Sequence, residues 1–328
     1  MKILIVKLSS LGDVVHAMPA VQDIRSALIA AEVHWVVEQP FASLVQRCEG
    51  VQAVIGCELR RWRKSPLGSR TRSEWRKFTG ELRSTAYDAV IDLQGLTKSA
   101  LVARAARLAQ GGVRFAMANR TDGSSYEAPT RWVADVAIPI APRVHAVTRS
   151  RELCARALGY EVPGELRFGL ASVHAHPQGE DAAAAPCVAL VHGTSRDEKC
   201  WPEPYWVELG RRLIDSGFSV GLPHGGAAEL ERAKRIAQAL GSHAHVWPRL
   251  GLGQLTDRIA ACAGVIGVDS GLSHIAVALD LPHVQIYNFD TAWRTGPLQR
   301  HRQLVVYAQP APPPQTVFQA WRQVQPAP

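Results

Sequence analysis

Long hydrophobic runs are missing from this sequence of 328 residues. No uninterrupted apolar stretch reaches about 18 residues, so we expect no transmembrane helix. The opening run MKILIVKL imitates a signal peptide, but Lys7 interrupts it and Gly12 and Asp13 follow closely, which makes the apolar run too short. The sequence therefore predicts a protein without a membrane-spanning segment.

Paired cysteines are also missing. The six cysteines are scattered, and no two of them form a C-x-x-C pair. This spacing argues against a disulfide framework and against a zinc site, and it fits reduced, mostly structural thiols in the cytosol. We therefore predict no metal site.

Three motifs that would assign a common chemistry do not occur. The turn after the first strand-like run lacks the G-x-G-x-x-G spacing of dinucleotide-binding proteins, and no Walker-type G-x-x-x-x-G-K-S/T is present. The segment GVDSG (267–271) differs from G-x-S-x-G, which excludes the nucleophile elbow of an α/β-hydrolase.

Positive charge is present in excess. The formal net charge is +8 and the pI is near 9.4, so at least one partner is expected to be anionic. No recognised nucleic-acid module surrounds the densest basic stretch, and no nucleic-acid partner is predicted.

Strand-like and helix-like stretches alternate along the chain, and its length favours two domains. Apolar, β-branched runs occupy 2–6, 32–38, 53–57 and 88–94. The pattern restarts at Cys187, with helix-like stretches over 204–217 and 228–240 and strand-like runs over 219–223, 243–247, 264–269 and 283–288. This alternation predicts an α/β fold of two doubly wound, Rossmann-like domains that face each other across a cleft.

The stretch between the two halves has no periodicity. Residues 169–186 are typical of an interdomain linker, which places the domains at 1–168 and 187–310. Residues 311–328 form a Pro-rich tail with one amphipathic piece around Val317 to Val324, and we expect this tail to return to the first domain.

Polar residues follow three of the predicted strands, where ligands bind in such sheets. The first junction is SSLGD (9–13). At the second, Thr194, Ser195 and Lys199 follow the strand VALV; at the third, a buried strand ends at Asp269 and a helix begins near Ser270. A helix N-terminus with small residues favours phosphate binding. A simple helix cap and an ordinary surface lysine are the alternative explanations.

The densest basic stretch is ELRRWRKSPLGSRTRSEWRK (58–77). Its first part surrounds Trp62 and contains Arg60, Arg61, Arg63 and Lys64. Arginines there can hold carboxylates or phosphates through paired hydrogen bonds. For the second part we favour a solvated helix or loop face; its cations are Arg70, Arg72, Arg76 and Lys77.

Eight segments together resemble the lipopolysaccharide heptosyltransferases, and most closely the type I members of that family. They are ILIVKLSSLGDVVHAMPA, WVVE, RRWRK, YDAVIDLQGLTKSA, RELCARALGY, TSRDEKCWPE, ERAKRIA and VDSGLSHIAVALDLP. The chain departs from the family at YNFDTAWRTGP (287–297), where the family commonly has Gly-Pro-Thr-Asp. The resemblance implies an inverting glycosyltransferase of the GT-B fold.

The resemblance also implies the substrates and the location. The donor would be ADP-L-glycero-β-D-manno-heptose, and the acceptor the first Kdo sugar of Kdo–lipid A in the lipopolysaccharide inner core. The protein would work on the cytoplasmic side, in peripheral contact with the anionic inner face of the cytoplasmic membrane. Transfer would need neither a metal nor a cofactor.

By the same resemblance, the second domain binds the donor. Lys199, the hydroxyls of Thr194 and Ser195 and the backbone N–H groups of Ser270, Gly271 and Leu272 would meet the charge that grows on the leaving ADP. The remaining donor-site candidates are Asp269 and His274, Glu229 at the ribose or adenine end, and Leu250 near the base.

The first domain would bind the acceptor. Asp13 would be the general base, and Gly12 would let the sugar approach the backbone. Ser10, the cluster Arg60, Arg61, Arg63 and Lys64, and Arg120 on the loop ANRTDG would complete the acceptor site. Three alternatives remain at this point: a type II heptosyltransferase with a different core acceptor, a nucleotide-sugar-binding protein without catalysis, and a basic nucleic-acid binder.

Overall fold

The computed structural model describes residues 1–172, 185–194, 196–298 and 301–325. The chain divides into two compact units, Met1–Ala171 and Ser172–Pro328. Residues at the start of the predicted linker belong to the first unit, because Glu49 N donates to Gly169 O (2.7 Å) and Ala171 N donates to Arg47 O (3.0 Å). Most of the predicted linker, residues 173–184, lies outside the described residues.

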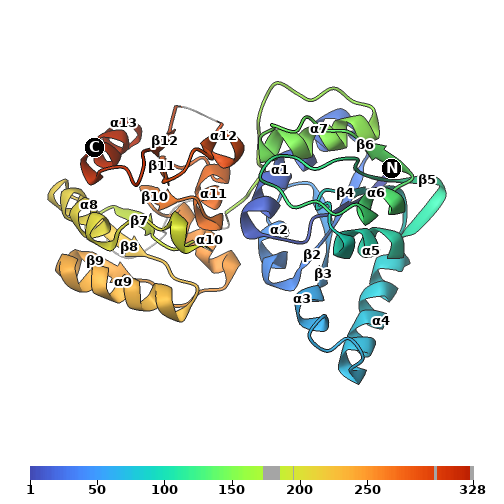
Figure 1. The fold of residues 1–328 in the computed structure, drawn as a ribbon, viewed down its shortest axis with the longest axis horizontal. Coiled ribbons are helices and arrows are strands. Elements are labelled where there is room, and N and C mark those ends of the chain that lie inside the picture. Colours follow the sequence, from blue (N-terminus) through green and yellow to red (C-terminus); the bar gives the residue numbers. More distant parts are fainter. Residues whose placement is uncertain (173–184, 195, 299–300, 326–328) are drawn as a thin grey trace. The chain divides into compact units, whose positions relative to one another are not determined.

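The first unit is built on a six-stranded parallel sheet in the order β3-β2-β1-β4-β5-β6 (Figure 1). Its strands are β1 (Lys2–Val6), β2 (Glu32–Glu38), β3 (Val51–Cys57), β4 (Ala86–Asp92), β5 (Arg107–Met117) and β6 (Val136–Ile138). Its helices are α1 (Leu11–Ala27), α2 (Ala42–Val45), α3 (Leu59–Trp62), α4 (Ser69–Ser84), α5 (Thr97–Ala105), α6 (Pro129–Val133) and α7 (Ala146–Leu158). This strand order is that of a doubly wound sheet, whose direction of winding reverses between β1 and β4.

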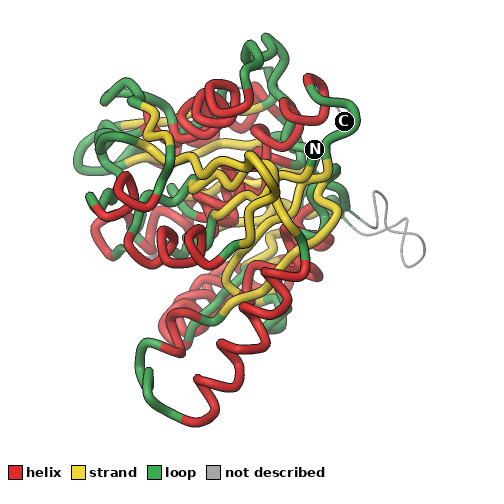
Figure 2. The backbone as a smooth tube through the Cα atoms, turned by 90° about the vertical axis from the view of Figure 1, so that its right-hand side faces the viewer, coloured by secondary structure: helices red, strands yellow, loops and turns green. Residues whose placement is uncertain are grey.

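Helices cover the sheet of the first unit because its strands are apolar on both faces. Leu4 and Val6 pack with buried side chains of α3, α4 and α5 in one cluster. Helix α1 packs along α7, and a buried ion pair joins them: Arg151 Nε and Nη2 donate to the two carboxylate oxygens of Asp23 at 2.7 and 2.9 Å. Helices α3 and α4 extend beyond the sheet, as the turned view shows (Figure 2).

The second unit repeats the architecture with the sheet order β12-β11-β10-β7-β8-β9. Its strands are β7 (Cys187–Val191), β8 (Ser219–Leu222), β9 (Ala244–Val246), β10 (Gly264–Val268), β11 (His283–Tyr287) and β12 (Gln303–Tyr307). Its helices are α8 (Glu203–Asp215), α9 (Ala227–Leu240), α10 (Leu252–Ala260), α11 (Gly271–Ala278), α12 (Ala292–Thr295) and α13 (Pro314–Val324). The winding reverses between β7 and β10, so both units confirm the predicted α/β, Rossmann-like fold.

The Pro-rich tail packs on the second unit, and the prediction that it returns to the first domain is wrong. Helix α13 contacts α8, β11 and β12. Its apolar stripe, Val317, Ala320, Trp321 and Val324, is buried in the core of this unit. Trp201 Nε1 also donates to Pro312 O at 2.9 Å. The second unit therefore extends through β12 and α13, well past the predicted boundary at residue 310.

Among the residues that the structure describes, every helix is too short or too polar to cross a membrane.

Candidate functional site

The turn after β1 carries the first group of candidate residues. Asp13 lies in the first turn of α1, and its Oδ2 accepts hydrogen bonds from Ser10 N (3.1 Å) and Ser10 Oγ (2.8 Å). Ser10 therefore holds the carboxylate in place, which is a structural contact in addition to the acceptor role predicted for it. Asp13 remains 37% exposed, so a ligand can reach its carboxylate.

Two buried cations flank Asp13, and sequence reasoning missed both. Lys7 Nζ lies 3.9 Å and Arg149 Nη2 lies 3.8 Å from Asp13 Oδ1. The Lys7 and Arg149 side chains are only 3% and 7% exposed. Lys7 Nζ also donates to Leu93 O at 3.0 Å, beyond the end of β4. Only the unusual lysine directly after an apolar strand gave any sign of this arrangement in the sequence.

These neighbours fix the ionisation of the turn. Burial alone would raise the pKa of Asp13, but the Lys7 ammonium, the Ser10 hydrogen bond and Arg149 outweigh it and hold the pKa well below its usual range. Burial lowers the pKa of Lys7 to about 8, and Arg149 contributes in the same direction while Asp13 opposes it. At neutral pH the site therefore presents an ionised carboxylate beside two cations.

The end of β4 supports the same turn across the point where the winding reverses. Gln94 Oε1 accepts from Leu8 N (3.1 Å) and Ser9 N (3.0 Å), which fixes the backbone before Asp13. Asp92 is fully buried, and burial raises its pKa to about 6 although Gln94 N, Gly95 N and Ser99 Oγ donate to it. The segment YDAVIDLQGLTKSA thus builds a rigid support for the turn.

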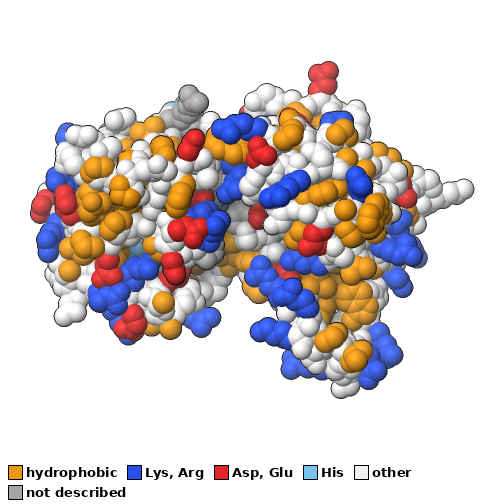
Figure 3. Space-filling model, viewed as in Figure 1, with side chains coloured by type: hydrophobic (Ala, Val, Ile, Leu, Met, Phe, Trp, Pro, Cys, Tyr) orange, Lys and Arg blue, Asp and Glu red, His pale blue; other side chains and the backbone are white. Residues whose placement is uncertain are grey.

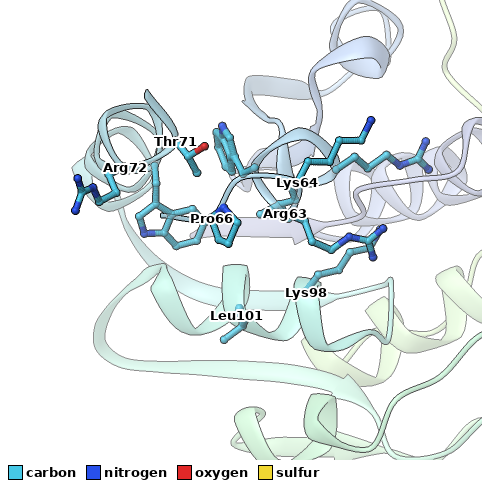
Figure 4. Close-up of a pocket in the computed structure, with 11 residues that line it drawn as sticks. Arg63, Lys64, Pro66, Thr71, Arg72, Lys98 and Leu101 are labelled. Atoms are coloured by element: carbon cyan, nitrogen blue, oxygen red, sulfur yellow. The ribbon is translucent and has the colours of Figure 1, made fainter. Parts of the chain in front are cut away.

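The predicted acceptor cluster divides in the structure. Arg61 forms ion pairs with Glu58, just before α3, and with Glu74 in α4, so its guanidinium is already engaged by carboxylates of the protein. Arg60, Arg63 and Lys64 are exposed and line a pocket between α3, α4 and α5, together with Lys98 and Arg72 (Figure 4). Arg72 is exposed on α4, as predicted for the second part of the basic stretch, and it also lies at the edge of this pocket. Lys98 Nζ donates to Ser9 Oγ at 3.4 Å, so this pocket adjoins the Asp13 turn.

The loop after β5 also reaches this turn. Arg149, which lies beside Asp13, donates through Nη1 to Thr121 Oγ1 at 3.0 Å. Arg120, the neighbouring residue, is exposed, and its Nε donates to Ser124 O at 3.3 Å. The structure thus brings the Arg120 loop and the Asp13 turn together within the first unit. The acceptor roles of Arg120 and of Gly12 stay predictions.

In the second unit, the candidates gather where β7 and β10 end. Lys199 Nζ forms an ion pair with Asp269 Oδ2, and His274 Nε2 lies 3.3 Å from Asp269 Oδ1. Thr194 Oγ1 donates to Asp269 O at 3.1 Å. Four residues that the sequence placed at two separate junctions are therefore in direct contact.

Asp269 is the centre of this group. Burial would raise its pKa, but the hydrogen bond and charge of His274 and the Lys199 ammonium outweigh it, so the pKa lies well below the usual range. Thr295 Oγ1 also donates to Asp269 Oδ1 at 3.3 Å, and Asn288 Nδ2 donates to Cys200 O at 2.9 Å. Thr295 and Asn288 belong to the segment where the chain departs from the family motif, so residue-by-residue matching missed them.

The remaining donor candidates lie around the same sheet edge. Ser270, Gly271 and Leu272 begin α11, and Ser270 is its N-cap residue. Glu229 lies in the first turn of α9 and accepts from Gly225 N at 2.6 Å; a side chain at Gly193 would collide with its carboxylate. Leu250 is half-buried on the loop before α10. Ser195 lies outside the described residues.

Comparison with known proteins places this geometry in a family. The sequence matches glycosyltransferase family 9 (heptosyltransferase) over residues 75–319. It is 39% identical to lipopolysaccharide heptosyltransferase 1 of Pseudomonas aeruginosa over 90% of this chain and 81% of the relative. It is 38% identical to the protein of the same name from Escherichia coli K12 over 88% of each chain.

Solved structures agree with this assignment. The structure described as E. coli heptosyltransferase WaaC with ADP has a TM-score of 0.86 and 35% identity, and the match covers 97% of this chain and 98% of the other. E. coli ADP-heptose lps heptosyltransferase II shares the fold, with a TM-score of 0.77 at 23% identity over 99% and 98% of the two chains. The chain belongs to glycosyltransferase family 9, the heptosyltransferases.

Proposed function

We propose that this heptosyltransferase moves L-glycero-D-manno-heptose from ADP-heptose to the first Kdo of Kdo–lipid A, with inversion at the anomeric carbon. The observation that carries the mechanism is the ionised Asp13 carboxylate, held between Lys7 and Arg149 at the end of β1. Relatives named heptosyltransferase 1 support the acceptor, since those from P. aeruginosa and E. coli K12 match about nine-tenths of the chain. The sequence match to the E. coli K12 protein named heptosyltransferase 2 covers only 33% of this chain.

On the acceptor side, Asp13 takes the proton from the attacking Kdo hydroxyl. Its pKa is low, so it is a weak base for an unactivated alcohol. Proton transfer therefore comes late, when the donor sugar has become oxocarbenium-like and the attacking hydroxyl is acidified. Arg60, Arg63 and Lys64 hold the carboxylate and phosphate groups of the acceptor. Arg120 contributes to the same site.

On the donor side, the bond between the anomeric carbon and the ADP oxygen breaks as the new glycosidic bond forms. Negative charge grows on the diphosphate, and Lys199 and the N–H groups at the start of α11 meet it. Asp269 and His274 keep Lys199 in position. One displacement needs one base and no covalent intermediate, and we propose that it needs no metal.

We further propose that the protein works at the cytoplasmic face of the inner membrane as a peripheral protein. Its net charge of +8 and the exposed cations along α3 and α4 support contact with an anionic lipid surface.

The test is direct. The purified protein is incubated with ADP-heptose and Kdo–lipid A, and both ADP release and the glycolipid product are followed. The proposal predicts one heptose on the first Kdo for each ADP released. Transfer to a larger core acceptor but not to Kdo–lipid A would assign a type II enzyme, and donor binding without ADP release on either acceptor would indicate a binding protein.

A further inference from the structure

The pocket between α3, α4 and α5 in the first unit has a volume of about 790 Å³, which is within the range of small-molecule sites. Its inner surface is mainly apolar; besides Thr71 it is lined by Leu59, Trp62, Pro66, Trp75 and Leu101. Trp62 and Trp75 meet edge to face with ring centroids 5.7 Å apart. Trp62 Nε1 donates to Glu74 at 2.8 Å, so the polar atom of this ring is satisfied away from any ligand.

The apolar surface of the pocket is accessible to a ligand. Leu101 is 56% exposed, and Trp75 is half-buried. Covering such side chains is favourable, because it removes apolar surface from water. An open apolar pocket beside a predicted binding site is therefore a candidate for part of a ligand.

Cations surround this apolar surface. Figure 4 shows Arg63, Lys64 and Lys98 extending to one side of Pro66, and Arg72 extending to the other. Over the α3–α4 end of the unit, hydrophobic side chains lie between Lys and Arg side chains (Figure 3). An apolar floor with a cationic rim matches an anionic amphiphile, whose hydrocarbon part is buried while its negative groups meet the rim.

One contact ties the pocket to the catalytic turn. Lys98 lines the pocket, and its Nζ donates to Ser9 Oγ at 3.4 Å, four residues before Asp13. A molecule that has a sugar at Asp13 and anionic groups at the rim can therefore place a hydrocarbon chain in the pocket.

We propose that this pocket holds one acyl chain of the lipid acceptor, while the basic rim holds the anionic groups of the same molecule. The inference rests on the proposed function, to which it adds a lipid-chain subsite. The acceptor's own chain is favoured over a chain from a bilayer lipid, because Lys98 joins the pocket to the turn that handles the reacting sugar.

The test compares acylated Kdo–lipid A, dispersed in detergent, with its fully deacylated counterpart. Leu101→Glu puts a charge at the pocket, and its exposed position lets the variant fold. Ile29→Glu is the matched control, because Ile29 is a 94% exposed apolar residue of the same unit that does not line this pocket. Leu101→Glu should raise the acceptor KM about tenfold for the acylated acceptor and less than twofold for the deacylated one. Ile29→Glu should change neither.

Equal effects of Leu101→Glu on both acceptors, or no effect on either, would overturn the subsite. Leu101→Glu could leave the ratio of the KM for the acylated acceptor to the KM for the deacylated one as in wild type, yet weaken sedimentation of the protein with phosphatidylglycerol vesicles. That result would assign the pocket to a bilayer lipid and would also overturn the acceptor subsite. If the wild type transfers to neither acceptor, the proposed function fails separately. The pocket is then tested with dodecyl phosphate below its critical micelle concentration, which Leu101→Glu should bind about tenfold more weakly; equal binding would reject the subsite.

Discussion

Lys7 and Asp13 show how a single buried side chain sets the chemistry of this turn. A lysine at the end of an apolar strand is costly to bury unless it meets a carboxylate and a carbonyl, and Lys7 meets Asp13 and Leu93 O. In return, its ammonium keeps Asp13 ionised despite burial. We infer that Lys7 is a positioning residue, which acts on the acceptor through the carboxylate.

Replacing Lys7 by Met should move the acid limb of the kcat–pH profile to higher pH. Without the ammonium, Asp13 loses the largest contribution that lowers its pKa, so the pKa rises and the base is protonated sooner as pH falls. Lys2→Met is the matched control, since Lys2 begins β1, the strand that Lys7 directly follows, and pairs with exposed Glu32. An unchanged acid limb in Lys7→Met would remove Lys7 from the ionisation of Asp13.

Lys7→Met should also change how the free energy of unfolding depends on pH, in a direction that the pKa of Lys7 determines. The pKa of Lys7 is lowered from 10.5 to about 8, so between these values the unfolded state binds more protons at this site than the folded state. The cost of burying the charge is therefore fully present below pH 8 and is relieved as pH rises toward 10.5. Wild type should gain unfolding free energy relative to Lys7→Met across that window in urea titrations. A constant difference would contradict the lowered pKa.

In the proposed mechanism, Lys199 stabilises the negative charge on the leaving ADP. Lys199→Ala should lower kcat about 10²–10³-fold and weaken ADP binding, because the ammonium meets charge that grows toward the transition state. Kinetics and calorimetry with ADP measure the two effects, and exposed Lys234 on α9 provides the control variant Lys234→Ala.

The activity of the wild type should also survive EDTA. A loss of activity that Mg²⁺ restores would contradict metal-independent transfer.

At the scale of elements, we distinguish basic residues that line the pocket between α3, α4 and α5 from basic residues elsewhere on α4. Arg63→Ala should raise the acceptor KM about tenfold and leave the donor KM unchanged, because a charge-assisted contact shielded by the bound acceptor is lost. Arg76→Ala is the control, since Arg76 is exposed on α4 and does not line the pocket. Equal effects of the two substitutions would indicate a diffuse basic surface.

Helix α13 tests the corrected placement of the tail. Trp321 is fully buried against the core of the second unit, with its ring centroid 5.6 Å from that of Phe218. Trp321→Ala should lower the unfolding free energy by about 3–5 kcal/mol, whereas Arg322→Ala on the exposed side should have little effect. Urea unfolding measures both. A tail that contributed nothing to this unit would tolerate the Trp321 substitution.

How well the sequence predicted the fold differed from one element to another. Strands with continuous apolar runs, such as β1 and β10, and the amphipathic helices α8 and α9 were predictable from periodicity. Strand β5 was not, because Gly111 has a φ of +76° within it and its pairing shifts register, which interrupts the pattern. The amphipathic piece in the tail was recognised, but periodicity cannot tell which core an apolar stripe covers.

At the candidate site, the sequence located residues at strand ends but not their partners. Asp13, Lys199 and Asp269 follow strands, and chain order reveals that position. Arg149 comes from α7, more than a hundred residues from Asp13, and only the folded sheet brings them together. Arg61 looked like Arg63 in the sequence, but Glu58 and Glu74 engage it in the structure.

At the scale of the whole molecule, two sheets of the same strand order divide the chemistry. The first unit carries the carboxylate and the basic pocket, and the second carries the Lys199–Asp269–His274 group. Each group lies where the winding of its sheet reverses, which is where doubly wound sheets bind ligands. In the proposed mechanism the base lies in the first unit and Lys199, which meets the leaving ADP, lies in the second, so this mechanism requires the intact chain.

The measurement that tests the central claim most directly is the turnover of Asp13→Asn with ADP-heptose and Kdo–lipid A. Asparagine keeps the size of the side chain and can accept from Ser10, but it cannot take the proton. The account predicts a loss of about 10²–10⁴-fold in kcat with an almost unchanged affinity for ADP, while Asp215→Asn at the exposed end of α8 behaves as wild type. Near-normal turnover by Asp13→Asn would contradict the assignment of the general base.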